Sequence, residues 1–178
     1  MDIYEAVNNR RSIRAYKTNS VPKETVVKVV DAARMAPSWA NGQCWRFILV
    51  ESKVEKKLLG KASGQANIAK ACEDAPYVVV FCASPKESGS KNGMDYYMFD
   101  CGLAMQSFVL AAHAEGLATC IIGWFDEKSV KGMLNIPDGY KVVAFTPLGC
   151  GSENPPRRSR KKYKDIVYDN TWGKSSGE

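Results

Sequence analysis

Hydrophobic residues along the chain gather in four short runs that are typical of strands in a buried sheet. Residues 77–83 (YVVVFCA) are apolar throughout, which is the pattern of a strand covered on both faces. Three less uniform runs cover residues 45–50, 117–124 and 141–150. The pattern therefore predicts a sheet of four core strands.

Between these runs, apolar residues recur at helical spacing. Val26, Val29, Val30 and Ala33 give one buried face to a helix that begins at Pro22. Asp2 and Asp126 are expected to cap two further helices. The shorter predicted helices cover residues 3–9, 54–61, a stretch that ends near 73, and 126–134. Because the helices do not alternate regularly with the strands, their order favours an α+β sandwich over a doubly wound parallel sheet.

The longest predicted helix covers about residues 94–115 and ends at Gly116, which suits a left-handed helix cap. Its length raises the possibility of a membrane span, but five polar residues interrupt the apolar run. They are Asp95, Asp100, Gln106, His113 and Glu115. We therefore expect a buried or intersubunit helix and no membrane partner.

The net positive charge of the chain is local. Lys and Arg number 25 against 19 Asp and Glu, a formal charge of +6, and six of the basic residues lie in residues 157–164, where there is no acid. Outside these eight residues the charges balance at 19 against 19. This distribution argues against a broad nucleic-acid-binding surface and predicts one anion-binding segment.

Histidine and cysteine usage excludes several kinds of site. The single histidine, His113, argues against His-rich zinc centres and catalytic triads, and we expect it to be structural. The six cysteines contain no C-x-x-C pair and mostly lie in apolar runs, so we expect buried, reduced thiols and no metal site. The N-terminal residues do not resemble a secretory signal, which predicts a cytoplasmic location.

Two polar segments stand out as candidates for ligand binding. Residues 10–14 (RRSIR) offer guanidinium groups and a hydroxyl, which suit a terminal phosphate, although such a segment is also typical of a solvated turn. Residues 37–45 (PSWANGQCW) carry amides that can match the edge of a heterocyclic ring, or they form a simple Asn-Gly turn.

Taken together, these motifs resemble those of the FMN-dependent nitroreductase family over nearly the whole chain. Residues 10–14 match the pattern R-[RH]-S-x-[RK], and residues 37–47 match P-S-x-x-N-x-Q-P-W-x-F. Residues 100–106 match a helix of the D-x-G-x-A-x-Q type, and a late basic segment completes the resemblance. Cys44 stands where the family usually has proline, and Trp39 stands where a smaller residue is common.

The resemblance implies a single domain over residues 1–178 with a three-layer sandwich, in which helices flank a mostly antiparallel central sheet. Residues 151–172 would form a C-terminal arm that is exchanged between the subunits of a homodimer and packs on the partner subunit. Its apolar side chains would otherwise be exposed. They are Tyr163, Ile166, Val167, Tyr168 and Trp172. Residues 173–178 are expected to be a disordered end.

The resemblance also implies which residues bind the flavin. Arg10, Arg11 and Ser12 would bind its phosphate and ribityl chain, and Arg14 would reach the pyrimidine edge. Arg158 and Arg160 would complete the phosphate site. A second group would come from the other subunit: Pro37, Ser38, Trp39, Asn41 and Gln43. Ile122 and Gly123 would lie along the ring, with a main-chain N–H near the reactive N5.

By the same resemblance, the chain would be an oxidoreductase in which the flavin, rather than a catalytic side chain, carries the chemistry. Tightly bound, non-covalent FMN would take hydride from NADH or NADPH and reduce nitroaromatics, quinones or a related small-molecule acceptor by a ping-pong mechanism. Reductive dehalogenation or flavin cleavage is an alternative within the same fold, but the span from Ser84 to Gly93 is short for the lids of those relatives. A basic nucleic-acid-binding module is a third hypothesis, although aromatic interleaving is limited to Tyr163.

Overall fold

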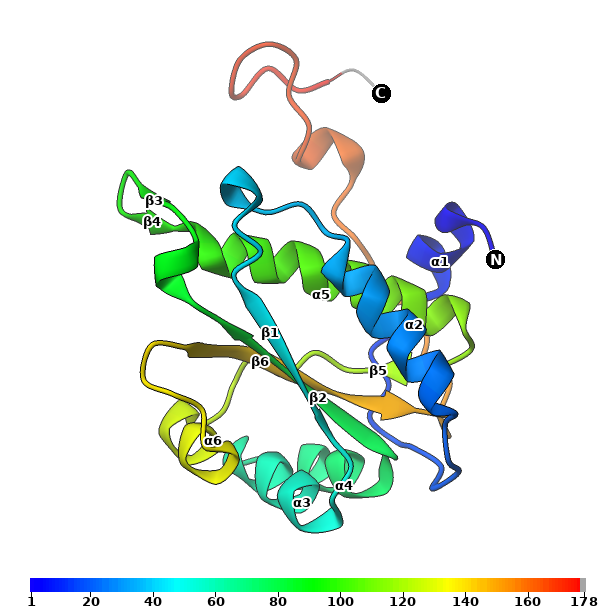
Figure 1. The fold of residues 1–178 in the computed structure, drawn as a ribbon. Helices are drawn as coiled ribbons and strands as arrows, with labels where there is room; N and C mark the ends of the chain where they lie inside the picture. Colours follow the sequence, from blue (N-terminus) through cyan, green and yellow to red (C-terminus); the bar gives the residue numbers. More distant parts are fainter. Residues whose placement is uncertain (177–178) are drawn as a thin grey trace.

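A four-stranded antiparallel sheet lies at the centre of the computed structural model, which describes residues 1–176 (Figure 1). The order across the sheet is β1 (Trp45–Val50), β2 (Tyr77–Ala83), β6 (Lys141–Gly149) and β5 (Ala118–Thr119). β2 pairs with β1 on one side and β6 on the other, and all its residues are buried. The prediction of a strand covered on both faces is confirmed.

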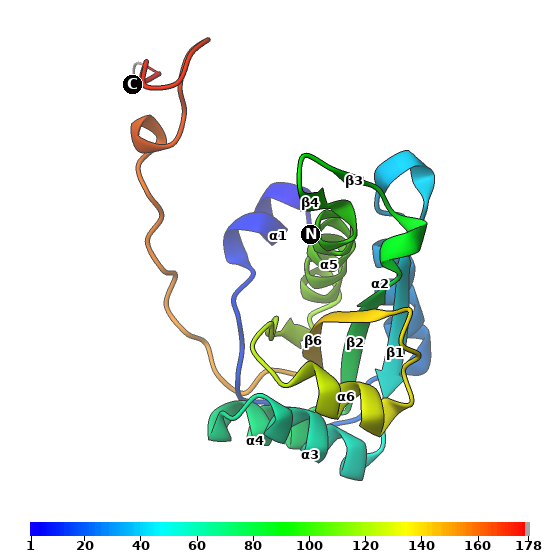
Figure 2. The ribbon, with the colours of Figure 1, turned by 90° about the vertical axis from the view of Figure 1, so that its left-hand side faces the viewer.

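Helices cover both faces of the sheet. On one face lie α2 (Lys23–Arg34) and α5 (Tyr96–Ala114), and on the other lie α3 (Lys53–Ala62), α4 (Ala66–Asp74) and α6 (Glu127–Leu134) (Figure 1). A further helix, α1 (Ile3–Asn9), packs beside α5 (Figure 2). The predicted three-layer α+β sandwich is confirmed.

Alternation along β2 divides the hydrophobic core into two parts. Val79 and Phe81 face α5, where the rings of Phe81 and Phe108 meet edge to face with centroids 5.3 Å apart. Val78 and Val80 face the other helix layer and belong to a second buried cluster with Phe145. Successive strand residues point to opposite faces, so a continuous apolar run supplies both cores.

Two of the predicted helix ends, the start of α1 and the end of α5, are confirmed by their hydrogen bonds. The Asp2 carboxylate accepts the main-chain N–H of Tyr4 at 2.6 Å and of Glu5 at 3.2 Å, and the Asp2 N–H donates to the Glu5 carboxylate at 3.3 Å. α5 ends in a left-handed Gly116 with φ 73°, and the N–H of Leu117 donates to the Ala112 carbonyl at 2.8 Å. None of the helices in residues 1–176 is both long and apolar enough to cross a membrane.

The strand predicted over residues 117–124 is much shorter in the structure. Only Ala118–Thr119 forms β5, followed by an isolated bridge between Ile122 and Phe145. The N–H of Cys120 donates to the hydroxyl of Thr146 at 3.0 Å instead of to a main-chain carbonyl of β6. A side chain therefore interrupts the ladder, and the apolar pattern cannot reveal such a substitution.

The start of the long helix also differs from the prediction. Met94–Asp95 forms a short strand, β4, which pairs with β3 (Ser90–Lys91), and α5 begins only at Tyr96. Asn92 and Gly93 join the two strands with φ values of 56° and 73°. An Asn-Gly pair at positive φ is a strong local hairpin signal, because it matches the twist of the flanking strands.

Residues 12–17 connect the N-terminal segment to both β5 and the end of β6. The N–H of Ile13 donates to the Thr119 carbonyl at 3.0 Å, and the N–H of Lys17 donates to the Cys150 carbonyl at 2.9 Å. The main-chain N–H of Ser152 donates to the Ala15 carbonyl at 2.9 Å. This segment is therefore held between two distant parts of the chain and is not a free turn.

After Gly151 the chain leaves the sandwich as an extended arm that passes α1 (Figures 1 and 2). Three of its apolar side chains are exposed, Tyr163 at 61%, Ile166 at 56% and Trp172 at 90%, whereas Val167 and Tyr168 are partly buried. Packing of residues 151–172 on a partner subunit stays a prediction. Residues 173–176, expected to belong to a disordered end, turn back so that Ser175 bridges Tyr168. Residues 177–178 lie outside the described part of the chain.

Two helical glycines provide a test of this packing. A Cβ at Gly60 in α3 would lie 2.5 Å from the Ala69 Cα of α4, whereas a Cβ at Gly132 in α6 would meet no atom within 4 Å. We expect Gly60→Ala to lower the free energy of unfolding by about 1 to 3 kcal/mol, because the two helices must separate. Gly132→Ala should raise it by about 0.5 to 1 kcal/mol through helix propensity. Urea unfolding of both variants measures the difference, and equal effects would contradict this packing.

Candidate functional site

Six arginine side chains line one cleft of about 510 Å³, which forms where the two ends of the chain meet. Arg10, Arg11 and Arg14 come from the N-terminal segment, together with Ser12. Arg157, Arg158 and Arg160 come from the arm. The structure thus brings together the six residues that the resemblance assigned to the phosphate and pyrimidine ends of the flavin. They are Arg10, Arg11, Ser12, Arg14, Arg158 and Arg160.

Local backbone geometry explains this convergence. The Arg10 N–H closes α1 by donating to the Ala6 carbonyl at 3.0 Å, and Arg10 itself is extended, with φ −56° and ψ 133°. The chain then runs beside β5 toward the start of the arm. There a Cβ at Gly151 would lie only 3.2 Å from the side chains of Ala118 and Ile13. Glycine therefore allows the arm to leave close to the N-terminal segment.

The positive charge in the cleft is not neutralised by the protein. Within residues 1–176, none of the six guanidinium groups forms an ion pair with a carboxylate. Arg11 donates to the main-chain oxygens of Asn8 at 2.6 Å and of Arg10 at 2.9 Å. Burial, and then the charge of Arg160, lower the pKa of Arg10. A bound anion would relieve this repulsion and satisfy the remaining donors.

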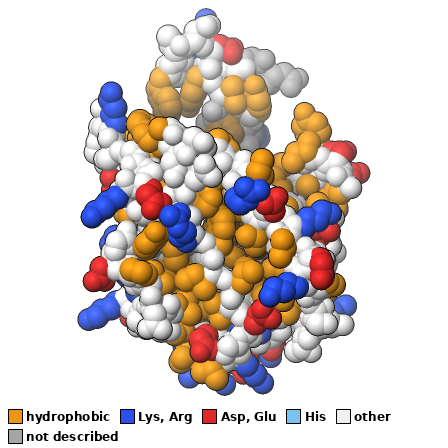
Figure 3. Space-filling model, in the orientation of Figure 1, with side chains coloured by type: hydrophobic (Ala, Val, Ile, Leu, Met, Phe, Trp, Pro, Cys, Tyr) orange, Lys and Arg blue, Asp and Glu red, His pale blue; other side chains and the backbone are white. Residues whose placement is uncertain are grey.

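The basic character of the cleft does not extend over the whole surface of the molecule. On the face drawn in Figure 3, Lys and Arg side chains are scattered among Asp and Glu without forming a continuous basic area. The only acid that lines the neighbouring cavity of residues 1–176 is Glu153, whose carboxylate accepts the main-chain N–H of Arg14. The cleft, with its six arginines, is therefore suited to a small, highly charged anion.

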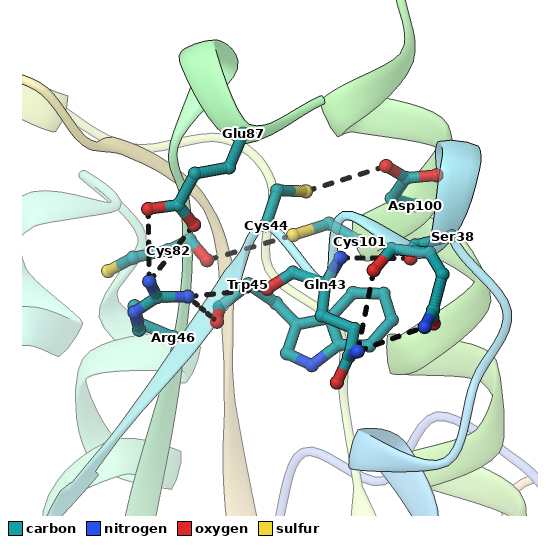
Figure 4. A network of polar contacts seen from close by, with 10 residues as sticks. Ser38, Gln43, Cys44, Trp45, Arg46, Cys82, Glu87, Asp100 and Cys101 are labelled. Atoms are coloured by element: carbon teal, nitrogen blue, oxygen red, sulfur yellow. Dashed lines mark hydrogen bonds and ion pairs between the residues drawn. The ribbon is translucent and has the colours of Figure 1, made fainter. Parts of the chain in front are cut away.

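The second predicted group of ligands lies on a strained loop that precedes β1. Residues Trp39–Asn41 form a short 3-10 helix, and Ala40, Asn41 and Gln43 have positive φ values of 45°, 57° and 47°. For residues other than glycine this left-handed backbone costs about 1 to 2 kcal/mol each. The Gln43 N–H donates to the Ser38 hydroxyl at 2.9 Å, and the Gln43 amide nitrogen lies 3.3 Å from the Asn41 side-chain oxygen (Figure 4).

Buried contacts hold this loop in place. The Trp39 N–H donates to the carboxylate of Asp100 on α5 at 2.9 Å. The Trp39 indole packs on Tyr96, with ring centroids 4.4 Å apart, and a Cβ at Gly89 would lie 2.2 Å from it. The indole is 40% exposed and is held against the start of α5. At the base of the loop, Arg46 forms an ion pair with Glu87 at 2.9 Å (Figure 4).

The two groups of predicted ligands do not share a cleft within one chain. None of residues 37–43 lines the arginine cleft, and in the view of Figure 2 α5 lies between the loop and α1. One flavin could therefore contact both groups only if a second subunit supplied the loop. That arrangement, expected from the resemblance for Pro37, Ser38, Trp39, Asn41 and Gln43, stays a prediction.

The expected role of Ile122 needs correction. Its side chain is 4% exposed and belongs to the core beneath the sheet, and its N–H already donates to the Phe145 carbonyl at 2.8 Å. The bridge to β6 turns the Ile122 side chain into the core, so this side chain is not placed to lie along the flavin ring. Its neighbours remain accessible, because Ile121 is 46% exposed and a Cβ at Gly123 would meet no atom within 4 Å.

Three polar residues of the cleft were not predicted as ligands. They are Asn8, Gln106 and Arg157. Gln106 is the last position of the D-x-G-x-A-x-Q motif, and Arg157 belongs to the basic segment, so the sequence could have indicated both as ligands. No motif in the sequence indicated Asn8, because its position in the cleft depends on how α1 packs against α5. Its side-chain oxygen lies 3.4 Å from the Arg157 guanidinium.

The cysteines and the histidine largely follow their predictions. All six thiols are free, and Cys150 alone of them is not fully buried. His113 lines a smaller cavity of about 280 Å³ that shares Arg10 and Arg11 with the cleft. Its buried Nε2 has no hydrogen-bond partner within residues 1–176. Burial, and then Arg10 and Arg11, lower the pKa of His113.

Comparison with known proteins identifies the class to which this arrangement belongs. The model of the nitroreductase family matches residues 7–150, so the chain belongs to the nitroreductase family. It is 33% identical over 162 residues to a protein of Methanothermobacter thermautotrophicus with the provisional name NADH dehydrogenase/NAD(P)H nitroreductase, a match that covers 89% of this chain and 82% of the relative.

Solved structures confirm the predicted nitroreductase-like fold. A nitroreductase family protein from Clostridium novyi NT is 35% identical and superposes with a TM-score of 0.83, covering 98% of this chain and 97% of the other. An FMN-dependent nitroreductase from Clostridium difficile R20291 is 26% identical, with a TM-score of 0.82 and coverage of 94% and 99%. The resemblance stated from the sequence motifs is therefore confirmed.

The environment of His113 predicts a pH-dependent stability. Because the folded pKa lies below the ordinary value of 6.5, protonation is less favourable in the folded than in the unfolded chain. The free energy of unfolding should therefore be unaffected by this group above pH 6.5 and fall as the pH drops through the folded pKa. Urea unfolding across this range should show a smaller loss for His113→Gln than for the wild type. Parallel pH profiles would contradict the expectation.

Proposed function

We propose that this protein is a homodimeric FMN-dependent oxidoreductase that takes hydride from NADH or NADPH and passes electrons to nitroaromatics, quinones or a related acceptor. Membership of the nitroreductase family supports the general class, an NAD(P)H-dependent flavin enzyme. The single observation that carries the proposal is the cleft in which six arginines meet without a carboxylate partner in the described chain.

The residues of the cleft fit the phosphate end of FMN. A phosphate monoester carries up to two negative charges and three acceptor oxygens, and guanidinium forks can donate two parallel hydrogen bonds to such a group. Arg10 and Arg11 would bind it from one side, Arg158 and Arg160 from the other, and the Ser12 hydroxyl adds one neutral donor. Burial, and then the charges of Arg160 and Arg11, lower the pKa of Arg10, and a dianion bound here would offset both effects.

Other residues would orient the ring and tune its electronics. Bound FMN supplies the two-electron redox chemistry, so no side-chain nucleophile or general base is required. Arg14 would place a positive charge near the pyrimidine edge and stabilise the negative charge of the reduced form. The amides of Asn41 and Gln43, with the Ser38 hydroxyl, would match donors and acceptors at the ring edge from the partner subunit.

Exposed apolar surface supports the homodimer. On α1, Ile3, Tyr4 and Val7 are 60%, 76% and 54% exposed, and on α5, Met98 and Phe99 are 52% and 61% exposed. The arm adds the exposed rings described above. A dimer interface would bury these side chains and would also bring the loop of residues 37–43 to the cleft of the other subunit.

Substitutions in the cleft test the phosphate site. Each charge-assisted hydrogen bond is worth about 1.5 to 3 kcal/mol, so Arg160→Ala or Arg10→Ala should raise the FMN dissociation constant about tenfold or more. Lys164→Ala, which changes a charge outside the cleft, is the matched control and should have little effect. Titration of flavin-free protein with FMN measures the three constants. If neutralising Arg158 and Arg160 together left FMN affinity unchanged but abolished binding to polyanions, the nucleic-acid hypothesis would replace this one.

Steady-state kinetics test the mechanism. We expect ping-pong behaviour, because donor and acceptor would occupy the same site in turn and could not react while bound together. Initial rates at several fixed concentrations of a quinone or nitroaromatic should give parallel double-reciprocal lines against NADH or NADPH. Intersecting lines without substrate inhibition would require both substrates to bind at once and would overturn this part of the proposal.

A further inference from the structure

Asp100 is a buried carboxylate that the functional assignment leaves unexplained. It lies in the second turn of α5 and is 1% exposed. Its oxygens accept the Trp39 main-chain N–H at 2.9 Å and the Ser88 hydroxyl at 2.8 Å. The Cys44 thiol also donates to it, at 3.5 Å (Figure 4). In the described chain no Lys, Arg or His forms an ion pair with it. Its surroundings therefore consist of neutral donors directed at one carboxylate.

Two of these three donors lie at the two ends of the strained loop. Trp39 directly precedes residues 40–43 and Cys44 directly follows them, so one carboxylate is bonded on each side of the left-handed residues. Between them the loop packs closely, because a Cβ at Gly42 would lie 2.1 Å from the Glu87 carbonyl oxygen. Asp100 therefore anchors the loop on both sides of its left-handed residues.

Stability alone does not account for this arrangement. Burying a carboxylate without a cationic partner is costly, and an apolar side chain of similar volume is often as good or better for stability. What the carboxylate provides is two acceptor oxygens that can hold three donors from two segments. Cys44 is one of these donors, at the position where the family usually has proline, which has no side-chain donor.

We propose that Asp100 is a positioning residue that holds residues 40–43 in the conformation that presents the Asn41 and Gln43 amides to the flavin. The inference rests on the proposed function, because that function assigns these two amides to FMN. Asp100 contacts neither of them and acts only through the backbone of the loop. It therefore sets the geometry of ligands supplied by one subunit to the site of the other.

Asp100→Asn tests the proposal while preserving the size of the side chain. Turned one way, its amide nitrogen would face the Trp39 main-chain N–H. Turned the other way, it would replace the oxygen that accepts from Ser88 and Cys44, whose hydroxyl and thiol would have to accept instead of donate. In both orientations the hydrogen bonds to a charged acceptor are lost or weakened, so the loop should loosen.

The matched control is Ser63→Ala, which removes a buried hydroxyl bonded to the Gly60 carbonyl at 2.7 Å on the opposite side of the sheet. Both variants should lose thermal stability. A difference between them in flavin binding or in the exchange of the loop amides therefore reports on the loop and not on overall stability.

Three measurements on the dimer separate positioning from a structural role. In Asp100→Asn we expect the FMN dissociation constant to rise roughly tenfold, the visible absorption band and midpoint potential of bound flavin to shift, and amide hydrogen exchange of residues 39–44 to accelerate in the flavin-free protein. Ser63→Ala should change none of these. If Asp100→Asn does not fold, Cys44→Ala should show the same changes in smaller measure, and Cys44→Ser, which keeps a donor, should resemble the wild type.

The outcomes also distinguish this inference from the proposed function. If wild-type protein binds FMN and Asp100→Asn binds it equally well, with an unchanged spectrum and potential, Asp100 is only structural and the inference is wrong. If the wild type itself binds no FMN, the proposed function fails and the inference fails with it. Faster exchange of residues 39–44 in both Asp100→Asn and Ser63→Ala would likewise overturn a specific role for Asp100.

Discussion

Main-chain hydrogen bonds from residues 12–17 hold the two ends of the chain together, and the candidate site depends on them. Ile13 is bonded to Thr119 beside β5, and Lys17 is bonded to Cys150 at the end of β6. A single such bond contributes about 1 kcal/mol to stability, but together they fix where the arm begins relative to α1. These bonds therefore hold the two basic segments beside the same cleft.

Both halves of the candidate site are costly for an isolated chain. In the cleft, burial and then the charge of Arg160 lower the pKa of Arg10. The loop before β1 holds Ala40, Asn41 and Gln43 in left-handed conformations. Such costs persist where the surrounding structure over-determines the geometry. In the cleft a bound anion would offset the repulsion, and in the loop the carboxylate of Asp100 and the hydroxyl of Ser38 hold the strained backbone.

Predictions from the sequence were most accurate where a pattern depends on residues that are close to one another in the sequence. The apolar run of β2, the Asp2 cap and the Gly116 helix end all follow from residues within one or two turns, and all are confirmed. Predictions failed where a distant side chain intervened. The hydroxyl of Thr146 replaces a ladder bond at Cys120 and shortens β5, and the bridge to Phe145 turns Ile122 into the core.

The sequence by itself determined the elements, the balance of charge and the motifs that mark the family, because these depend on residue type and local spacing. Only the tertiary structure decided that Asn8 joins the arginine cleft, that Ile122 is buried, and that Asp100 binds the loop 61 positions before it. The physical reason is that these relations arise from packing between segments far apart along the chain. Neither hydrophobic periodicity nor composition encodes which of those segments become neighbours.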